Sequence, residues 1–412
     1  MAVSRDGRKS LSTLLSIHRL AQDLYWANEL EEAEQLFREA LAGRISELGD
    51  NDADTMASRY QLARCLSAQE QFKEAIELRR QEFYWCQTTE QVEIQDMLIS
   101  MKGLGCDLLA AGEPEEALEL LQNCLAQRQT VLGISNNDTL STLIPIFKAL
   151  ATLNRQQEAI SLSQITQKAL AAELGDNAPE VLTQLFNQAS LQEELGELEA
   201  AEASYKQCLS RRIESQGQEH PDTNYTRYCL ADLLSNQNRH AEAIPLRQQE
   251  LAWCRTEKGD TDPSTLSSLN QLAIDLRETN QLEEAEMLFR ELVESNKQVL
   301  EVDDFQIGRA LGGLAITLER ADKIKEATAF AQQALDHRLE HEGPDAWWTN
   351  RNRITLARLL HKSEQSDQSL LLLFDLLTSM KQLTEPDEHD RSLITEAEQL
   401  IESIRFGTGS DQ

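Results

Sequence analysis

Residues 337–341 read HRLEH, the H-x-x-E-H spacing with which some zinc peptidases place two imidazoles and a carboxylate on one helix face. The string directly precedes Gly343, where we expect a helix to end. Imidazoles are favourable near the C-terminus of a helix because of its dipole. We therefore interpret the string as a polar helix end, and residues 387–390 (DEHD) as a solvated loop between helices.

Other residue patterns that support catalysis or cofactor binding are missing from the sequence. It contains neither a phosphate-binding loop nor a nucleophile-elbow motif, and its seven cysteines include no C-x-x-C pair. An odd set of cysteines in helical stretches favours buried free thiols and a reducing compartment. The sequence therefore predicts a non-enzymatic protein without metal or cofactor. A zinc hydrolase that uses His337 and His341 is the alternative, and an assay for bound zinc would separate the two.

Composition and charge narrow the class of partner. The 412 residues carry 70 acidic and 39 basic side chains, a net charge of −31, which repels nucleic acid and anionic lipid surfaces. No signal peptide is evident, and the longest apolar run, residues 370–374, is far too short to cross a bilayer. We expect a cytoplasmic protein with a protein or peptide partner, without nucleic acid or membrane.

The helices that would position a functional site are repeated along the chain. Residues 28–41 (NELEEAEQLFREAL) and 280–293 (NQLEEAEMLFRELV) are identical at ten of fourteen positions. Steps of 42 residues from Ala33 meet alanine through Ala327 and then Ser369. A second register starts at Ala21 and continues at every 42nd residue after it. Most of these residues are small, and leucines flank most of them on one helix face. The period predicts an all-α solenoid of about nine helical hairpins.

Turn residues recur with the same period. We call Ala33 and its equivalents the small anchors. The residue five positions before each small anchor is in most repeats one that tolerates a left-handed backbone, as a turn between two helices needs. Glycines such as Gly49 and Gly217 suit the ends of the second helices, and we expect Asp54, Asp138 and Asp222 to cap the helices that follow.

These patterns resemble a known family. Leu-Ala-x-x-Leu followed by Ala-x-x-x-Phe or Tyr, as in Ala33 with Phe37, resembles the tetratricopeptide repeat. The longer unit and the linker EHPDT (219–223) resemble kinesin light chains and bacterial multi-repeat proteins, and EGPDAWWT (342–349) resembles the end of arrays fused to bacterial serine/threonine kinases. The resemblance covers residues 12–380. It implies a right-handed superhelix that binds proteins, commonly through peptides on its concave surface.

The resemblance also implies which positions of each first helix line that surface. They lie six and three residues before Ala21 or its equivalent, the second-register residue, and one and four residues after it. We call these positions the inner face. It carries seven basic and three acidic residues, a balance of +4. The basic residues are Arg64, Lys102, Lys148, Arg277, Arg309, Arg351 and Arg358, and the acidic ones are Glu193, Asp232 and Glu319. The aromatic and amide residues on or beside it are Tyr25, Tyr60, Phe186, Asn187, Tyr225, Tyr228 and Asn270.

Domain organisation follows from the repeat. We expect a flexible N-terminus over residues 1–11, nine repeats over 12–380, a C-terminal capping helix within 381–406 and a disordered tail over 407–412. Pro145 falls inside a first helix, and Gln188 and Gln192 occupy leucine positions, which predicts a hinge over residues 140–205.

The functional prediction is a protein-interaction scaffold whose inner face binds an acidic peptide segment with an aromatic anchor. The alternative is a regulatory or sensor array that uses its convex or terminal surface, linked to kinase signalling. The oligomeric state and the identity of the partner are not given by the sequence.

Overall fold

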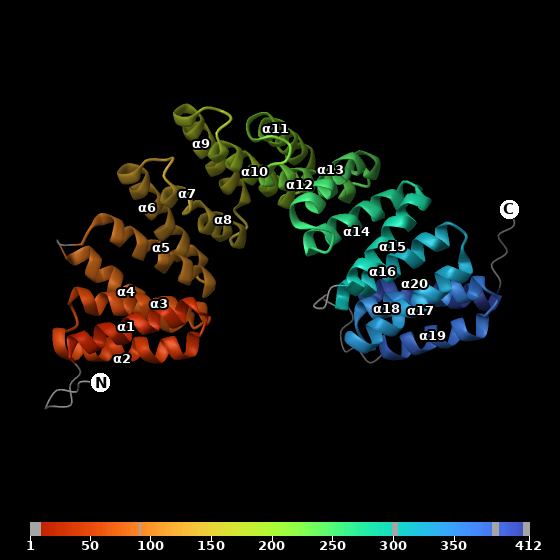
Figure 1. The fold of residues 1–412 in the computed structure, drawn as a ribbon, viewed down its shortest axis with the longest axis horizontal. Coiled ribbons are helices and arrows are strands. Elements are labelled where there is room, and N and C mark those ends of the chain that lie inside the picture. Colours follow the sequence, from red (N-terminus) through yellow and green to blue (C-terminus); the bar gives the residue numbers. More distant parts are fainter. Residues whose placement is uncertain (1–9, 90–91, 299–303, 381–386, 407–412) are drawn as a thin grey trace. The chain divides into compact units, whose positions relative to one another are not determined.

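The computed structural model describes residues 10–89, 92–298, 304–380 and 387–406. These residues form helices joined by turns, with no strand among them (Figure 1). The chain divides into two compact units, residues 1–204 and 205–412. The expected tail, residues 407–412, and most of the expected flexible N-terminus lie outside the described residues. Ser10 already caps the first helix, which begins at Leu11.

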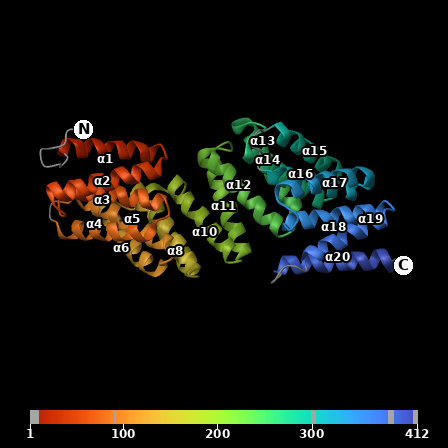
Figure 2. The same ribbon diagram turned by 90° about the horizontal axis from the view of Figure 1, so that it is seen from below.

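Each unit is a run of antiparallel helical hairpins, and each hairpin packs on the next (Figures 1 and 2). The first unit contains α1 (Leu11–Trp26), α2 (Leu30–Leu48), α3 (Ala53–Ala68), α4 (Phe72–Thr88), α5 (Ile94–Ala110), α6 (Pro114–Leu132), α7 (Asn137–Leu140), α8 (Leu143–Thr152), α9 (Gln156–Leu174) and α10 (Pro179–Glu194). Helix α11 (Leu198–Gln216) contains the boundary between the units.

The second unit contains α12 (Pro221–Asn236), α13 (His240–Lys258), α14 (Pro263–Glu278), α15 (Leu282–Gln298), α16 (Asp304–Arg320), α17 (Ile324–His341), α18 (Trp347–Lys362), α19 (Ser366–Met380) and α20 (Glu388–Phe406). Helix α20 packs on α18 and α19 through Leu393, Ala397 and Ile401 and so covers the last hairpin. The loop predicted at residues 387–390 is therefore wrong in part, because Glu388 begins α20 and Asp387 accepts a hydrogen bond from the amide of Asp390.

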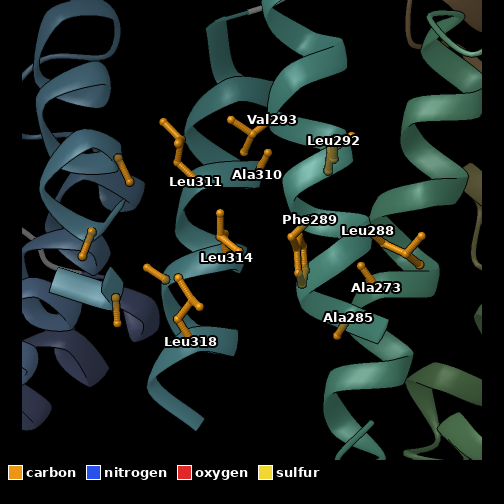
Figure 3. Close-up of a cluster of buried hydrophobic side chains, with 14 of the residues drawn as sticks. Ala273, Ala285, Leu288, Phe289, Leu292, Val293, Ala310, Leu311, Leu314 and Leu318 are labelled. Atoms are coloured by element: carbon orange, nitrogen blue, oxygen red, sulfur yellow. The ribbon is translucent and has the colours of Figure 1, made fainter. Parts of the chain in front are cut away.

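The small anchors explain why the hairpins pack so closely. Ala33, Ala285 and their equivalents are fully buried, and the hydroxyl of Ser369, the one serine among them, donates to the carbonyl oxygen of Ala357 at 2.6 Å. Without a bulky side chain, the second helix of a hairpin can approach the first. Figure 3 shows the resulting layer in the second unit, where Phe289 of α15 lies in one cluster with Leu314 of α16.

The turn within each hairpin uses a left-handed residue, as the sequence predicts. Asn28 has φ 64° and Asn280 has φ 63°. Glu70 (φ 60°) and Glu364 (φ 62°) adopt the same conformation, although glutamate gave no reason to expect it. The geometry of the hairpin therefore overrides the preference of the residue at these two turns.

The turn between hairpins is fixed by a glycine and a threonine. Gly49 ends α2 with φ 91°, and its carbonyl oxygen accepts a hydrogen bond of 2.9 Å from the hydroxyl of Thr55 in α3. Thr223 repeats this contact with Gly217. The predicted helix caps were two residues out of place. Asp52, Asn136 and His220 are the capping residues, and their side chains accept from the amides of Asp54, Asp138 and Asp222.

The first helix of the fourth hairpin is interrupted. Where the period predicts one helix, α7 ends at Leu140 and α8 begins at Leu143, two residues before Pro145. Proline has no amide hydrogen, so the helix cannot continue through this point with a complete set of hydrogen bonds.

Candidate functional site

Arg64 is the centre of an aromatic cluster on the inner face of the first unit. It extends from α3 toward the end of α1, and its Cζ lies 5.0 Å from the Tyr25 ring centroid, 5.5 Å from that of Trp26 and 5.7 Å from that of Tyr60. Its Nη1 donates to Oε1 of Gln61 at 3.1 Å. No carboxylate pairs with Arg64 among the residues that the structure describes. The guanidinium is therefore held in place by rings and an amide, with its charge uncompensated.

Lys102 and Lys148 lie on the first helices of the next two hairpins. Nζ of Lys102 donates to Oγ of Ser141 at 2.7 Å, and burial lowers the pKa of Lys102 below its ordinary value. Lys148 is exposed on α8. Within the described part of the chain, neither lysine forms an ion pair, so three consecutive hairpins each present one unpaired cation on the inner face.

A cavity of about 440 Å³ lies among α3, α4 and α5, beside Arg64. Tyr60 and Gln61, which contact Arg64, also line this cavity. Most of its remaining wall is apolar or aromatic, formed by Ala53, Met56, Ala57, Trp85, Cys86, Val92 and Ile99. We call it the α3–α5 cavity.

Two acidic groups line the α3–α5 cavity as well. Glu82 is buried, accepts hydrogen bonds from Ser100 and Cys86, and has a pKa raised by burial. Asp96 is exposed. An apolar side chain could enter this cavity, but an anionic one would meet both carboxyl groups.

A second cavity, of about 390 Å³, lies between α8 and α10. Ser141, the partner of Lys102, lines it together with Asn187, and Ile144 beside them is 70 % exposed. The structure thus brings Lys102 and Asn187 to neighbouring places on the first unit. Phe186 is half-buried on the same helix as Asn187.

In the second unit, most of the basic residues singled out on the inner face are already paired. Arg358 forms two hydrogen bonds, of 3.0 and 2.9 Å, with the carboxylate of Glu319, and Arg351 pairs with Glu396 of α20. Arg277 pairs with Glu278 at 3.0 Å. Arg309 has no carboxylate partner among the described residues. Counting charges along the sequence treats all of these arginines alike, whereas the structure leaves few of them available.

The aromatic and amide positions of the second unit also differ from those of the first. Tyr225 is 58 % exposed, but the Tyr228 ring lies 4.9 Å from Cζ of Arg247, whose guanidinium is buried and pairs with Asp232. Asn270 is only 1 % exposed, so its amide is part of the interior rather than of an open groove.

One buried network occurs in both units. Tyr60 stacks on Arg79, which pairs with Asp107, and four periods later Tyr228 stacks on Arg247, which lies 3.5 Å from Asp275. Trp85 and Trp253 also repeat one contact, since their indole N–H groups donate to the carbonyl oxygens of Asn51 and Glu219 at 2.9 and 2.7 Å. Arg64, by contrast, is replaced by Asp232 in the second copy.

Sequence reasoning missed Trp26, Gln61 and Trp85 at this site. Trp26 is 73 % exposed and stacks on Arg64, yet it lies outside the four inner-face positions. The spacing of 168 residues between Trp85 and Trp253 was the signal that could have identified the wall of the α3–α5 cavity.

The H-x-x-E-H string shows a different arrangement. The rings of His337 and His341 lie 4.5 Å apart at the end of α17, and Arg338 between them is buried and pairs with Glu342. Over the described ranges, no group of three or more His, Cys, Asp or Glu side chains is arranged to hold a metal ion. None of the helices searched in those ranges is both long and apolar enough to span a bilayer.

Stacked helical hairpins with polar and aromatic side chains on their first helices define a helical-repeat protein of the interaction type. Sequence models of the tetratricopeptide repeat match residues 11–81, 98–138, 185–212 and 222–298, more than half of the chain. The chain belongs to the tetratricopeptide repeat family. No curated protein sequence matches it significantly.

The chain is similar to several solved structures. A kinesin light chain of Podosopora anserina with nearly identical TPR-like repeats is 25 % identical and aligns over 50 % of this chain and 97 % of its own, with a TM-score of 0.45. The apo quorum sensor NprR of B. thuringiensis is 14 % identical over 90 % of this chain and 99 % of its own, with a TM-score of 0.48.

A signal-transduction ATPase of Pyrococcus horikoshii with a tetratricopeptide repeat sensor is 10 % identical and has a TM-score of 0.55. The alignment covers 89 % of this chain and 55 % of that protein. At this identity the similarity shows the fold alone. The resemblance to arrays fused to kinases stays a prediction.

Proposed function

We propose that this chain is a non-enzymatic scaffold that binds an acidic peptide segment with an aromatic anchor on the inner face of its first unit. The tetratricopeptide fold is one of protein–protein interaction. The observation that carries the finer proposal is Arg64, an inner-face guanidinium that three aromatic rings position and no described carboxylate neutralises.

The ion pairs of the inner-face cations favour binding of an acidic ligand at the first unit rather than at the second. A ligand carboxylate that approaches Arg64 gains a charge-assisted hydrogen bond without breaking an existing ion pair. The same ligand at Arg358 would have to displace Glu319, whose carboxylate accepts hydrogen bonds from both Nε and Nη2 of that guanidinium. Lys102 and Lys148 extend the unpaired positive charge over the next two hairpins.

The aromatic anchor is supported by Trp26 and Tyr25. Their rings lie 5.4 Å apart in an edge-to-face arrangement, and Trp26 leaves 73 % of its surface in solvent. An aromatic side chain of a ligand would bury part of this surface while its neighbouring carboxylate contacts Arg64. Contacts of this kind commonly dominate the affinity of peptide interfaces.

The test is capture of partners from native lysate by the full chain, followed by mass spectrometry. The variant Arg64→Glu, Lys102→Glu, Lys148→Glu removes the unpaired cations. The matched control Lys73→Glu, Lys168→Glu, Lys325→Glu makes the same change in net charge at exposed positions on second helices. Loss of a partner with an acidic, aromatic-containing segment from the first variant alone supports the proposal.

Retention of all partners by both variants would contradict it. The convex or terminal surface would then be the place of interaction, as in the regulatory or sensor alternative. Equal loss in both variants would attribute the binding to overall charge and would also contradict a site on the inner face.

A further inference from the structure

We infer that the cavity between α8 and α10 binds the tyrosine side chain of an acidic peptide, with the phenolic hydroxyl bonded to the side-chain amide of Gln184. We call this cavity the α8–α10 cavity. The inference rests on the proposed function for the class of ligand, and it adds a binding site on the fourth and fifth hairpins to the aromatic cluster around Arg64. The unpaired amide of Gln184 and the position of Lys102 carry the argument.

The α8–α10 cavity lies beside the break in the first helix of the fourth hairpin. Leu140 ends α7 and Leu143 begins α8, and both line the cavity together with Ile144. Most of the remaining wall comes from α10, through Pro179, Glu180, Thr183, Gln184 and Asn187. Apolar cavities of about 150 Å³ already accept benzene. The volume of about 390 Å³ is therefore sufficient for one aromatic ring.

Gln184 brings an unsatisfied polar group to this cavity. Its side chain is 4 % exposed, and its Oε1 has no hydrogen-bond partner within the part of the chain that the structure describes. A buried amide oxygen without a partner is costly, and most such atoms in folded proteins are paired. A ligand group that bonds to this amide would therefore supply a partner that the chain itself does not.

The repeat explains why Gln184 lacks a partner. One period earlier, the equivalent residue is Thr142, whose hydroxyl accepts a hydrogen bond of 3.0 Å from Nη1 of Arg128. One period after Arg128 stands Leu170, which is fully buried and has no donor in its side chain. The fifth hairpin thus carries a longer polar side chain where the fourth carries a threonine, and the arginine that would bond to it is missing.

The chemistry of an amide selects tyrosine among the aromatic side chains. A glutamine amide has an accepting end and a donating end, and a phenolic hydroxyl can both donate and accept. An indole N–H only donates, and phenylalanine offers neither function. The phenol ring also suits the apolar part of the wall, formed by Leu140, Leu143 and Ile144. Tyrosine is therefore the aromatic residue that satisfies both the wall and Gln184.

Lys102 explains why the tyrosine should have an acidic neighbour. Ser141 lines the α8–α10 cavity, and its Oγ accepts a hydrogen bond of 2.7 Å from Nζ of Lys102. An ammonium group has three donors, and Ser141 uses one of them. A carboxylate beside the tyrosine can therefore bond to Lys102 at the edge of the cavity. Glu180 in the wall disfavours a carboxylate inside the cavity itself.

The test uses the full chain and two fluorescently labelled peptides, with binding followed by anisotropy. One peptide carries a tyrosine with glutamate on both sides, and the other carries phenylalanine in place of the tyrosine. We expect the tyrosine peptide to bind about threefold to tenfold more tightly, which is the factor that one hydrogen bond is worth. Equal affinity within twofold, or no binding of either peptide, would overturn the inference.

The variant Gln184→Leu assigns the preference to the amide. It removes both polar ends of the side chain and keeps the wall apolar. The affinity for the tyrosine peptide should fall to that for the phenylalanine peptide, which should itself change by less than about twofold. A preference for tyrosine that persists in Gln184→Leu would overturn the assignment of the hydroxyl to this residue.

The variant Thr183→Trp fills the α8–α10 cavity from an exposed position on α10 and should weaken both peptides at least about tenfold. Thr130→Trp on α6 is the matched control. Thr130 is also exposed, and the hydroxyls of both threonines donate to the carbonyl oxygen four residues earlier, at 2.9 and 3.0 Å. The control should bind both peptides as the wild type does. Equal weakening by the two variants would overturn the assignment of the site to this cavity.

The variant Arg64→Glu separates this inference from the proposed function. Binding that is lost with Arg64→Glu and kept with Thr183→Trp would place the peptide at the aromatic cluster around Arg64, so that the proposed function stands and the inference fails. If the tyrosine preference depends on Gln184 while the triple charge-reversed variant keeps all its lysate partners, the tyrosine site stands without the proposed function.

Discussion

Arg128 in α6 donates a 3.0 Å hydrogen bond from Nη1 to the hydroxyl of Thr142, which belongs to the next hairpin. The same nitrogen donates to the carbonyl oxygen of Asp138 at 2.6 Å. Arg44 makes the equivalent contacts with Ser58 and Asp54. These buried guanidinium groups satisfy polar atoms at the start of the following helix and so join consecutive hairpins.

Replacing Arg128 by Met should lower the free energy of unfolding by about 2–4 kcal/mol, because buried acceptors lose a charged donor. Urea unfolding followed by circular dichroism measures the change. Arg155→Met is the matched control, since Arg155 is exposed and its guanidinium pairs with Glu158 of the same helix end. We expect no measurable change for the control, and a similar effect of both substitutions would contradict the structural role of Arg128.

Replacing Glu70 by Gly should stabilise the protein by about 1 kcal/mol. Glu70 has φ 60°, a conformation that is costly for a residue with Cβ and not for glycine. The control Ala68→Gly lies two residues earlier, at an exposed position in the last turn of α3, and should destabilise by about 0.5–1 kcal/mol. Thermal unfolding of both variants gives the comparison, and the same sign for both would contradict the prediction.

Replacing Ala285 by Leu should destabilise the second unit by about 1–3 kcal/mol, because the side chain is fully buried against neighbouring helices. Met287→Leu, two residues later on the same helix and 62 % exposed, is the control and should change little. Differential scanning calorimetry would detect the difference. A tolerated Ala285→Leu would show that the helices can separate at this point.

His18 should make stability depend on pH. Burial, and secondly Arg44, lowers the pKa of His18 from 6.5 to about 4, while Asp54 acts in the opposite direction. Its ring also contacts Phe37, and Nδ1 lies 3.4 Å from Oγ of Ser58. Between these pH values the unfolded chain binds a proton that the folded chain does not. Stability is therefore lost as pH falls from 6.5 toward 4, by roughly 3 kcal/mol.

The measurement is urea unfolding at pH 7, 6, 5 and 4 for the wild type and for His18→Gln. The curve of the variant should be flatter over this range, whatever its stability at pH 7. Parallel curves would show that other groups account for the pH dependence.

Residues 140–205 should exchange amide hydrogens faster than either flank. Helices α7 and α8 are separated near Pro145, and polar contacts replace apolar ones in this segment. Ser163 donates to the carbonyl oxygen of Gln184, and Ser204 donates to the side chain of Gln192, both at 2.8 Å. Hydrogen exchange with mass spectrometry tests the prediction. Uniform protection along the chain would contradict a hinge in this segment.

The fold was readable from the sequence because one physical requirement repeats every 42 residues. A hairpin buries its apolar stripe only against its neighbours, so Ala33 and its equivalents must stay small and the turns must stay left-handed. The residue type alone did not reveal the conformation of Glu70, because there the packing of the two helices determines the backbone.

The candidate site was harder to predict from the sequence than the fold. Arg64 and Arg358 are equivalent positions in sequence, but only the structure shows that Glu319 neutralises one and that rings surround the other. Pairing depends on where side chains from different hairpins meet, which a linear period does not encode. Trp26 was missed for the same reason, since it reaches Arg64 from outside the expected positions.

The network of Tyr60, Arg79 and Asp107 has a consequence for how this array can be cut and rejoined. It reaches from α3 to α5, so the removal of one hairpin would separate the guanidinium from its ring or from its carboxylate. Two consecutive hairpins, α3–α4 and α5–α6, carry the whole network, and Tyr228, Arg247 and Asp275 repeat its contacts 168 residues later. A single repeat of 42 residues is therefore too short to carry this network when the array is cut.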